Sequence, residues 1–535
     1  GGLLILKHKV EDFEFYTLYG HNTIRSVLKN KIGAKIKKGD IIAEIANYPE
    51  NGNWAPHLHF QIMLSTLNYK IDFPGVCYYN QIEIWKDLCP NPNLLFKSLA
   101  LNYTNDKSDD ELIKYRKKHL GKSLKLHYEE PINIVRGEGV YLISKNGRKY
   151  LDTINNVAHV GHENESVVIE GQSQMSILNT NSRYLHKSIN ELAKEIIQTL
   201  PEKLNVIHFV NSGSEANELA IRMMKSHTGS NDIIVSENGY HGNTNICVDI
   251  SSYKFDGKGG KGAPENTHVI PMPTKFNGKH KGENASKGYI SEIENSINNL
   301  KSKNRGLGGF IIEPIISCGG QVELPDGFLK TAYDLIRKNG GICISDEVQV
   351  GCGRLGESFW GFELHDVIPD IITIGKPLGN GHPIGAVVCT SEIAESFANG
   401  MEFFNTFGGN PVSCSIATQV LKVVKNENLQ KNAKTIGNYF KNELKNLSDK
   451  YDIIGDVRGQ GLFLGIEFVD HKMNPLFKET KYIVNRLKDF GILASLDGPN
   501  NNVIKIKPPL IFNKDNCDTF IFYLHKILDE DFLNK

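Results

Sequence analysis

Two residues of opposite charge stand just after two apolar segments of the chain. Asp346 follows Ile342–Ile344 after a single serine, and Lys376 follows Ile371–Ile374 after a single glycine. Either group alone could be a satisfied structural one, but two opposite charges at the ends of consecutive buried strands indicate a site. A lysine kept away from water loses its proton easily, which is what Schiff-base chemistry requires. The sequence therefore predicts a lysine-based active site at these strand ends.

A Gly-Ser turn, NSGSEAN at 211–217, follows a further apolar segment. Ser212 and Glu215 have the spacing of a capping box, so a helix is expected to begin here. The free N–H groups and the positive dipole end of a helix start suit a phosphate group. Taken alone, the turn is explained more simply as an ordinary well-capped helix.

The elements that must hold these residues alternate after residue 121. Continuous apolar segments are separated by amphipathic ones such as Phe328–Arg337. This pattern predicts an α/β fold with a mostly parallel sheet between helices. Ligands of such sheets bind beyond the carboxyl ends of the strands. The expected strands are 206–210, 233–235, 310–312, 342–344, 371–374 and 386–388.

The charge balance excludes several classes of function. Lys+Arg and Asp+Glu are both 61 in the 535 residues, so no net positive field exists to hold a nucleic acid or an anionic membrane. Hydrophobic residues, at 40%, suffice for a large core. The 9 cysteines include no CxxC pair, which argues against a disulfide framework or a zinc knuckle and favours a cytoplasmic location.

Three regions of the chain differ in pattern. Residues 1–85 hold short β-type segments, including 41–45 and 58–62, between Gly, Asn and Pro turns, and they predict a small all-β module. Residues 86–120 are expected to be a linker that also contains the first helix of the main domain. Residues 121–535 carry the α/β pattern and form that main domain.

Five motifs in the main domain resemble those of class III aminotransferases, the fold-type-I enzymes that use pyridoxal 5′-phosphate (PLP). They are SGSEAN at 212–217, YHG at 240–242, DEVQ at 346–349, GKPLGNG at 375–381 and NTFGGNP at 405–411. The resemblance spans residues 121–535. It implies a large domain at about 165–425, a smaller α+β domain from 121–164 and 426–535, and a homodimer.

The resemblance also implies roles for individual residues. Lys376 would attach the cofactor covalently and later move protons, while Asp346 would pair with the pyridinium nitrogen and keep the ring an electron sink. In the same way, Gly213 and Ser214 would hold the cofactor phosphate, Tyr240 and Val348 would cover the two ring faces, Gln349 would sit near the ring hydroxyl, and Thr406 would reach the cofactor phosphate of the neighbouring subunit.

Segments 155–162, 178–183, 497–499 and 502–509 look closest to one branch, the ethanolamine-phosphate and 5-phosphohydroxylysine phospho-lyases. Many transaminases of the class have an arginine where this chain has Lys505. Lysine is a poorer bidentate partner for a carboxylate but still suits a phosphate. Arg183, Lys505 and Lys507 are therefore candidates for binding the phosphate of a small phosphorylated amine, each being otherwise an ordinary surface or ion-paired cation. The alternative is a transaminase that moves an amino group to a keto acid.

The front module resembles the second half of a lysostaphin-type zinc metallopeptidase. In that family the last histidine of the HxH motif binds zinc, here His59, while His21 and His57 would be the catalytic pair. The other two ligands of the family have no equivalent before His21, and one residue cannot hold zinc. Zinc is therefore not expected in this chain unless a longer one completes the site. A zinc peptidase or a murein-binding protein is the third alternative.

Overall fold

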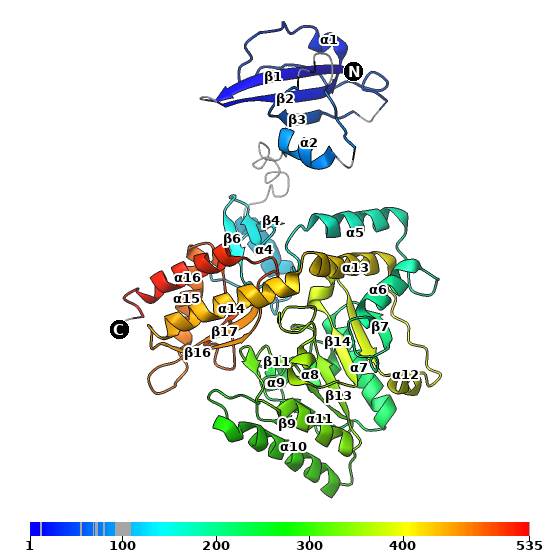
Figure 1. Cartoon of the computed structure of the whole chain (residues 1–535), viewed down its shortest axis with the longest axis vertical. Helices are drawn as coiled ribbons and strands as arrows, with labels where there is room; N and C mark the ends of the chain where they lie inside the picture. The colour runs from blue at the N-terminus through cyan, green and yellow to red at the C-terminus, as the bar shows by residue number, and fades with distance from the viewer. Residues whose placement is uncertain are drawn as a thin grey trace. The chain divides into compact units, whose positions relative to one another are not determined.

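The computed structural model describes residues 1–10, 13–53, 56–67, 69, 73–78, 81–90, 92 and 109–533. The chain divides into two compact units, Gly1–Lys125 and Leu126–Lys535 (Figure 1). Of the expected linker 86–120, residues 91 and 93–108 lie outside the described residues. The family-like pattern expected from residue 121 thus begins close to the start of the second unit.

The first unit is built on an antiparallel sheet of three strands in the order β1-β2-β3, with a small core around Leu18, Met63 and Phe73. Its sheet confirms the small β module that the sequence had suggested, and short helices accompany it. The elements are β1 (Gly2–Val10), β2 (Phe13–Asn22), α1 (Ile24–Val27), β3 (His59–Met63), α2 (Ile82–Leu88) and α4 (Asp109–His119).

The strand expected at 41–45 is wrong, because only Ile45 makes an isolated bridge, to Asn22. Two backbone groups that could form hydrogen bonds to a neighbouring strand bond to side chains instead. The Ile42 carbonyl accepts from Asn30 Nδ2 at 2.7 Å, and the Glu44 N–H donates to Ser26 Oγ at 3.0 Å. With its backbone bonded in this way, the segment runs as a loop beside the sheet.

The second unit is organised around a seven-stranded sheet in the order β7-β15-β14-β13-β10-β8-β9. The strands from β14 to β9 are parallel, and β15 is antiparallel to both of its neighbours. The mostly parallel sheet is thereby confirmed. The strands are β7 (Val206–Val210), β8 (Ile233–Ser236), β9 (Thr267–Ile270), β10 (Gly309–Ile312), β13 (Ile342–Asp346), β14 (Ile371–Ile374) and β15 (Gly385–Cys389).

The six expected strands are all present, and β9 is the one that the sequence pattern missed. It lies at the edge of the sheet, and its middle residues, His268 and Val269, are not buried. An edge strand needs no continuous apolar segment, so the signal that marks the central strands is absent there.

Alternate residues of each central strand enter two different cores. In β13, Cys343 packs in the core that includes Ile336 of α11 (Phe328–Lys338), whereas Ile344 packs in the core that includes Met223 of α7 (Gly213–Thr228). This two-sided burial explains why the strands are apolar throughout. The other helices around the sheet are α5 (Glu165–Ile177), α6 (Lys187–Ile197), α8 (Asn245–Asp249), α9 (Ser252–Phe255), α10 (Ala285–Ser302), α12 (Ser391–Phe397) and α13 (Pro411–Asn426).

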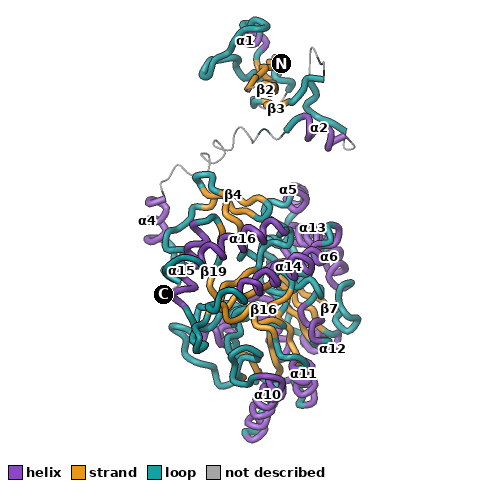
Figure 2. Tube along the Cα trace, turned by 60° about the vertical axis from the view of Figure 1, so that its left-hand side comes forward, coloured by secondary structure: helices purple, strands orange, loops and turns teal. Residues whose placement is uncertain are grey.

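Two four-stranded sheets pack with α13, α14, α15 and α16 around a further core in the same unit, and Figure 1 shows α14 beside β16 and β17. In the tube view of Figure 2, as in Figure 1, α13 runs alongside α5 and α6. The elements are β4 (Ile134–Glu138), β5 (Tyr141–Ser144), β6 (Lys149–Asp152), α14 (Leu429–Ser448), β16 (Ile454–Gln460), β17 (Phe463–Phe468), α15 (Phe477–Asp489), β18 (Ile492–Leu493), β19 (Ser495–Asp497), β20 (Val503–Ile506) and α16 (Lys514–Leu528), with the short pair β11 (Ile315–Ile316) and β12 (Val322–Glu323) nearby.

The helix expected after Ser212 is present as α7, but its cap differs from the reciprocal capping box. Ser212 Oγ accepts from the Glu215 N–H at 3.1 Å, as predicted. The Glu215 carboxylate accepts from the N–H of Asn211 at 2.5 Å instead of from that of Ser212. The Glu215 side chain thus bonds the backbone at Asn211, one residue before the position that it would bond in a capping box.

Replacing this cap should weaken the helix start. We expect Ser212→Ala to lower the free energy of unfolding of the apoprotein by about 1 kcal/mol, because one N-terminal N–H loses its acceptor. Urea denaturation measures the change. Ser291→Ala, on an exposed position of α10, is the control and should have little effect. Equal effects of the two variants would contradict the role of Ser212 as the cap.

Candidate active site

The carboxyl ends of two neighbouring parallel strands meet at one cavity. Asp346 is the last residue of β13, and Lys376 begins a short 3-10 turn (Lys376–Gly379) directly after β14 and Gly375. Both line a cavity of about 180 Å³. The whole lining is Gly213, Ser214, Asn217, Tyr240, His241, Gly242, Glu313, Asp346, Val348, Gln349 and Lys376.

Seven of the eight residues predicted to hold the cofactor are in that lining, and Thr406 is the exception. It lies exposed on the loop that precedes α13, and it does not line the cavity of its own chain. Lys376 is half-buried, and among the residues that the structure describes its amine makes no hydrogen bond or ion pair. The lysine is therefore available for covalent chemistry.

Asp346 is almost completely buried, and three donors hold its carboxylate. Oδ2 accepts from His241 Nδ1 at 2.7 Å and from Asn217 Nδ2 at 2.8 Å. Oδ1 accepts from the Val348 N–H at 3.0 Å. These three hydrogen bonds offset the cost of burying a polar group. An anionic group is thus held ready for a cationic partner in the cavity.

Glycines let the backbone approach the cavity closely. A Cβ atom on Gly213 would lie 2.6 Å from Val348 Cγ1, and one on Gly242 would lie 2.6 Å from Ser214 Oγ. Gly242 also has a φ of 140°, a region that favours glycine. Together with the start of α7, these positions form a cradle of backbone N–H groups that suits a phosphate.

Sequence reasoning missed four residues of this lining, His241, Asn217, Gly242 and Glu313. The first two lie inside motifs that were recognised, but their bonds to Asp346 join segments far apart in the chain. Glu313 follows directly on β10 much as Lys376 follows on β14, so the rule about strand ends could have found it. Burial, and then the negative charge of Asp346, raise the pKa of the Glu313 carboxyl to about 7.

The three substrate candidates lie in different surroundings. Arg183 is exposed, where it pairs with Glu402 at 3.0 Å and stacks on the Phe404 ring at 3.9 Å. Lys505 pairs loosely with Asp497 at 3.5 Å, and Lys507 is buried. Burial, and then the positive charge of Lys505, lower the pKa of the Lys507 ammonium to about 7. The two lysines thus lie close enough for the charge of Lys505 to act on Lys507. Arg183, in contrast, is an ordinary ion-paired cation at the surface.

The three candidate site histidines of the front module also lie close together. The ring centroids of His21 and His57 are 4.6 Å apart, and those of His21 and His59 are 5.7 Å apart. Within the described ranges of the chain, no group of three or more His, Cys, Asp or Glu side chains is placed to hold a metal ion. The described residues therefore offer no set of ligands for a zinc ion.

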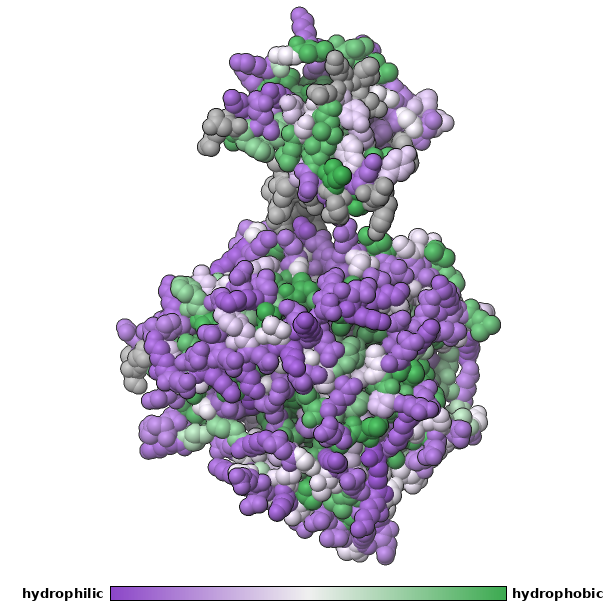
Figure 3. Space-filling view, viewed as in Figure 1, coloured by the Kyte–Doolittle hydropathy of each residue, from purple (hydrophilic) through white to green (hydrophobic). Residues whose placement is uncertain are grey.

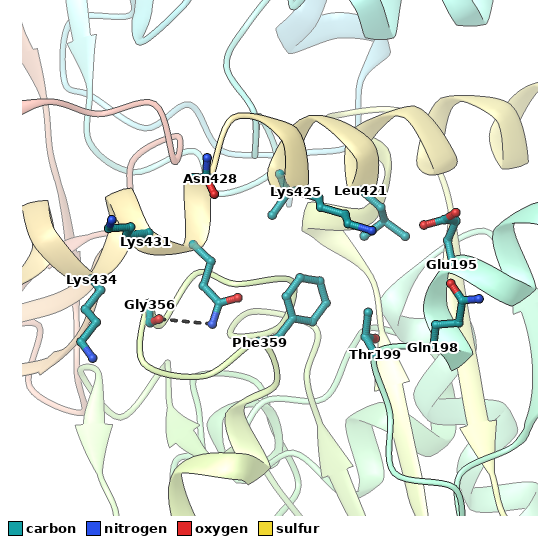
Figure 4. Close-up of a pocket in the computed structure, with 12 residues that line it drawn as sticks. Glu195, Gln198, Thr199, Gly356, Phe359, Leu421, Lys425, Asn428, Lys431 and Lys434 are labelled. Atoms are coloured by element: carbon teal, nitrogen blue, oxygen red, sulfur yellow. Dashed lines mark hydrogen bonds between the residues drawn. The ribbon is translucent and has the colours of Figure 1, made fainter.

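A larger pocket, of about 500 Å³, lies elsewhere in the second unit, between α6, α13 and the start of α14 (Figure 4). Lys425, Lys431 and Lys434 border it together with Glu195 and Phe359. Lys434 pairs with Glu357, and none of the motif residues reaches this pocket. Size alone therefore does not identify the site of chemistry.

The second unit has an α/β fold with a mixed sheet. The ends of its strands place a free lysine amine and a buried, hydrogen-bonded aspartate at one cavity. This combination is typical of the PLP-dependent aminotransferase fold. The sequence matches the family described as Aminotransferase class-III over residues 125–528. The chain therefore belongs to the class III aminotransferase family, as the five motifs predicted.

Relatives within the family carry two kinds of name. The Drosophila melanogaster protein "Alanine--glyoxylate aminotransferase 2-like" is 44% identical over 442 residues, covering 81% of this chain and 90% of that protein. The Caenorhabditis elegans "Ethanolamine-phosphate phospho-lyase homolog 1" is 38% identical and covers 79% and 94%. A solved structure of a phospholyase from Arthrobacter in complex with phosphoethanolamine has a TM-score of 0.75 at 35% identity, covering 78% of this chain and 99% of that one.

The residues present fit the cofactor of the family. Besides the free Lys376 amine and the glycine cradle, two buried atoms beside Asp346, His241 Nε2 and Asn217 Oδ1, have no partner within the described chain. Unpaired buried polar atoms are costly, and at an active site they mark a place where a polar ligand belongs. Gly213 and Ser214 would hold its phosphate, and Asp346 its ring nitrogen.

Burial of Lys507 gives a stability prediction. In the unfolded chain the pKa of a lysine is about 10.4, whereas the pKa of Lys507 in the folded protein is about 7. Between these values the unfolded state binds more protons, so the stability of the apoprotein rises with pH. Lys507→Met removes this dependence, so its gain in Tm over the original protein should be largest near pH 7 and shrink towards pH 10.

Differential scanning fluorimetry across that pH range measures the effect. Lys330→Met, at an exposed position of α11, is the matched control and should show no such trend. A gain that is equal at every pH would show that the Lys507 ammonium is solvated in the folded protein.

Proposed function

We propose that this enzyme is a phospho-lyase that eliminates phosphate from a small phosphorylated amine such as ethanolamine phosphate. The observation that carries the proposal is Lys505, a cation on β20 whose one ion pair within the described chain is with Asp497, at 3.5 Å. A side chain bonded so loosely has N–H groups left for a ligand, and a lysine suits phosphate better than a planar carboxylate. The named phospho-lyase relative and the phosphoethanolamine complex support the same assignment.

The residues of the cavity have distinct tasks in such a reaction. PLP, when bound, supplies an electron sink for a carbanion next to nitrogen. Lys376, the free amine of the cavity, takes the proton from the substrate carbon that bears nitrogen. Asp346, held by His241 and Asn217, supplies the negative charge that keeps the cofactor nitrogen protonated.

The bonds balance without a second substrate. The C–H bond and the C–O bond to phosphate both break, inorganic phosphate leaves, and water then releases an aldehyde and ammonia. No keto acid takes part. A transaminase is the alternative, favoured by the aminotransferase names of several relatives, and it would need a keto acid to complete each turnover.

Ethanolamine phosphate given to the PLP-loaded enzyme without a keto acid separates the two functions. We expect release of inorganic phosphate and acetaldehyde, detected by a phosphate assay and by coupled alcohol dehydrogenase. Lys376→Ala should lose at least about 10²-fold of this rate, since it removes the base, and should also lose the visible absorption of the bound cofactor. Strict dependence on pyruvate or glyoxylate would contradict the phospho-lyase assignment.

We further propose that the active enzyme is a homodimer with shared sites. Thr406 lies exposed, away from the cavity of its own chain, as expected if it reaches the cofactor phosphate of a second subunit. Large apolar side chains are also exposed on α5 and the segment after it, and green patches interrupt the purple surface in Figure 3. They are Val168, Ile169, Met175, Ile177, Leu178, Tyr184 and Leu185. An apolar surface of this kind is typical of a protein–protein interface.

Subunit complementation tests the shared site. Lys376→Ala and Thr406→Asp each disable both sites of their own homodimer, the second because a carboxylate repels the cofactor phosphate. In a mixed dimer one site carries both changes and the other carries neither. Mixing the two inactive variants under subunit exchange should therefore restore about a quarter of the original activity, because roughly half of the dimers are mixed. No recovery, with mixed dimers verified by native mass spectrometry, would contradict a shared site.

The role of the front module and the location of the protein are likewise proposals. The family match begins at residue 125, so the first unit is proposed to be an appendage that takes no part in the PLP reaction. All 9 cysteines are free thiols, which favours a reducing compartment such as the cytoplasm. Within the part of the chain that the structure describes, none of the helices combines the length and the hydropathy of a membrane span.

A further inference from the structure

A chain of buried side chains runs from Lys507 to the cofactor cavity. Lys507 Nζ donates to Gln349 Oε1 at 2.7 Å, and Gln349 Nε2 donates to Ser317 Oγ at 2.6 Å. Ser317 in turn donates to Glu313 Oε1 at 2.5 Å. All four residues are buried, and both Gln349 and Glu313 line the cavity.

The Gln349 amide can take only one orientation in this chain. Its Oε1 accepts from Lys507 Nζ and also from Asn156 Nδ2 at 3.2 Å, which uses both lone pairs of the oxygen. While it is protonated, the Lys507 amine donates and cannot accept, so it excludes the flipped amide, whose NH₂ group would face it. With one Nε2 hydrogen given to Ser317, one N–H of Gln349 remains for the cavity.

The far end of the chain reaches the cavity as well. Glu313 Oε2 is buried and has no hydrogen-bond partner within the described residues. Since Oε1 accepts from Ser317, the carboxyl group is turned so that the unpartnered oxygen is the one left for a ligand. The chain therefore presents two oriented polar groups to the cavity, an amide N–H and a carboxyl oxygen, each aligned by its neighbour.

We propose that Lys507 is a positioning residue, which through Gln349 and Ser317 sets the orientation of the two polar groups that meet the cofactor. This inference rests on the proposed use of the cavity for PLP, but not on the phospho-lyase reaction. It also revises the candidate set for substrate phosphate. Lys507 is only 6% exposed and already bonded to Gln349, whereas the side chain of Lys505 is 23% exposed.

Spectra of the PLP-loaded enzyme without substrate test the proposal. Lys507→Met keeps the approximate length of the side chain and removes the donor. We expect it to shift the visible absorption and circular dichroism bands of the bound cofactor and to raise the cofactor dissociation constant roughly 10-fold, the equivalent of one hydrogen bond. Lys505→Met, two residues earlier, is the matched control and should leave both spectra unchanged.

Inorganic phosphate provides the second measurement. As an inhibitor it should bind the Lys507→Met variant within about 2-fold of the original affinity, while Lys505→Met should weaken it about 10-fold. Unchanged cofactor spectra in Lys507→Met together with lost phosphate binding would overturn the proposal and make Lys507 a phosphate ligand. Shifted spectra with no effect of either lysine on phosphate would support the positioning role and contradict only the proposed phosphate site.

A second variant covers the case in which Lys507→Met does not fold, which far-ultraviolet circular dichroism would reveal. Ser317→Ala breaks the chain at its next link and leaves Lys507 in place. It should shift the cofactor spectra in the same direction as Lys507→Met and leave inhibition by phosphate unchanged. Spectra like those of the original protein in Ser317→Ala would overturn the proposal.

Discussion

The active site depends on one buried carboxylate, that of Asp346. A negative charge at the end of a strand that is covered on both faces is costly unless donors surround it. His241, Asn217 and the Val348 N–H are those donors, and each comes from a different part of the backbone around the cavity. The need to satisfy one charge thus fixes the relative positions of β13, the start of α7 and the loop after β8.

The same geometry explains why small residues surround the charge. Gly213 and Gly375 lie so close that a Cβ on Gly375 would be 3.1 Å from the Gly213 backbone. The beginning of α7 and the turn after β14 can therefore share one small cavity. A phosphate group needs this close approach because backbone N–H groups bind it only when no side chain intervenes. The glycines and the helix start work as one unit, which a capping box alone could not reveal.

Features of the fold and of the site that leave a local pattern in the sequence were predictable, and features that depend on contacts with other segments were not. Strands such as Ile371–Ile374 were predictable because burial on both faces leaves a continuous apolar segment, and Lys376 was predictable because its charge interrupts that pattern. Edge strand β9 was not, because its middle residues are not buried and it lacks such an apolar segment. The loop at 41–45 was not, because side chains bond its backbone groups. His241 escaped because its bond to Asp346 joins segments far apart in the chain, and a histidine in sequence gives no sign of the acid that it will face. Glu313 directly follows β10, so the rule about strand ends could have found it.

The charges of Lys505 and Lys507, which lie outside the lining of the cavity, connect the chain of buried side chains with the type of substrate. Lys505 and Lys507 are two residues apart at the end of β20, and the positive charge of Lys505 helps to lower the pKa of Lys507. A bound anion near Lys505 would oppose that effect and favour a protonated Lys507. A phosphate carries roughly 1.5 to 2 negative charges at neutral pH, against one for a carboxylate. A phosphorylated amine would therefore keep Lys507 charged, and so keep the Gln349 amide aligned, more effectively than an amino acid would.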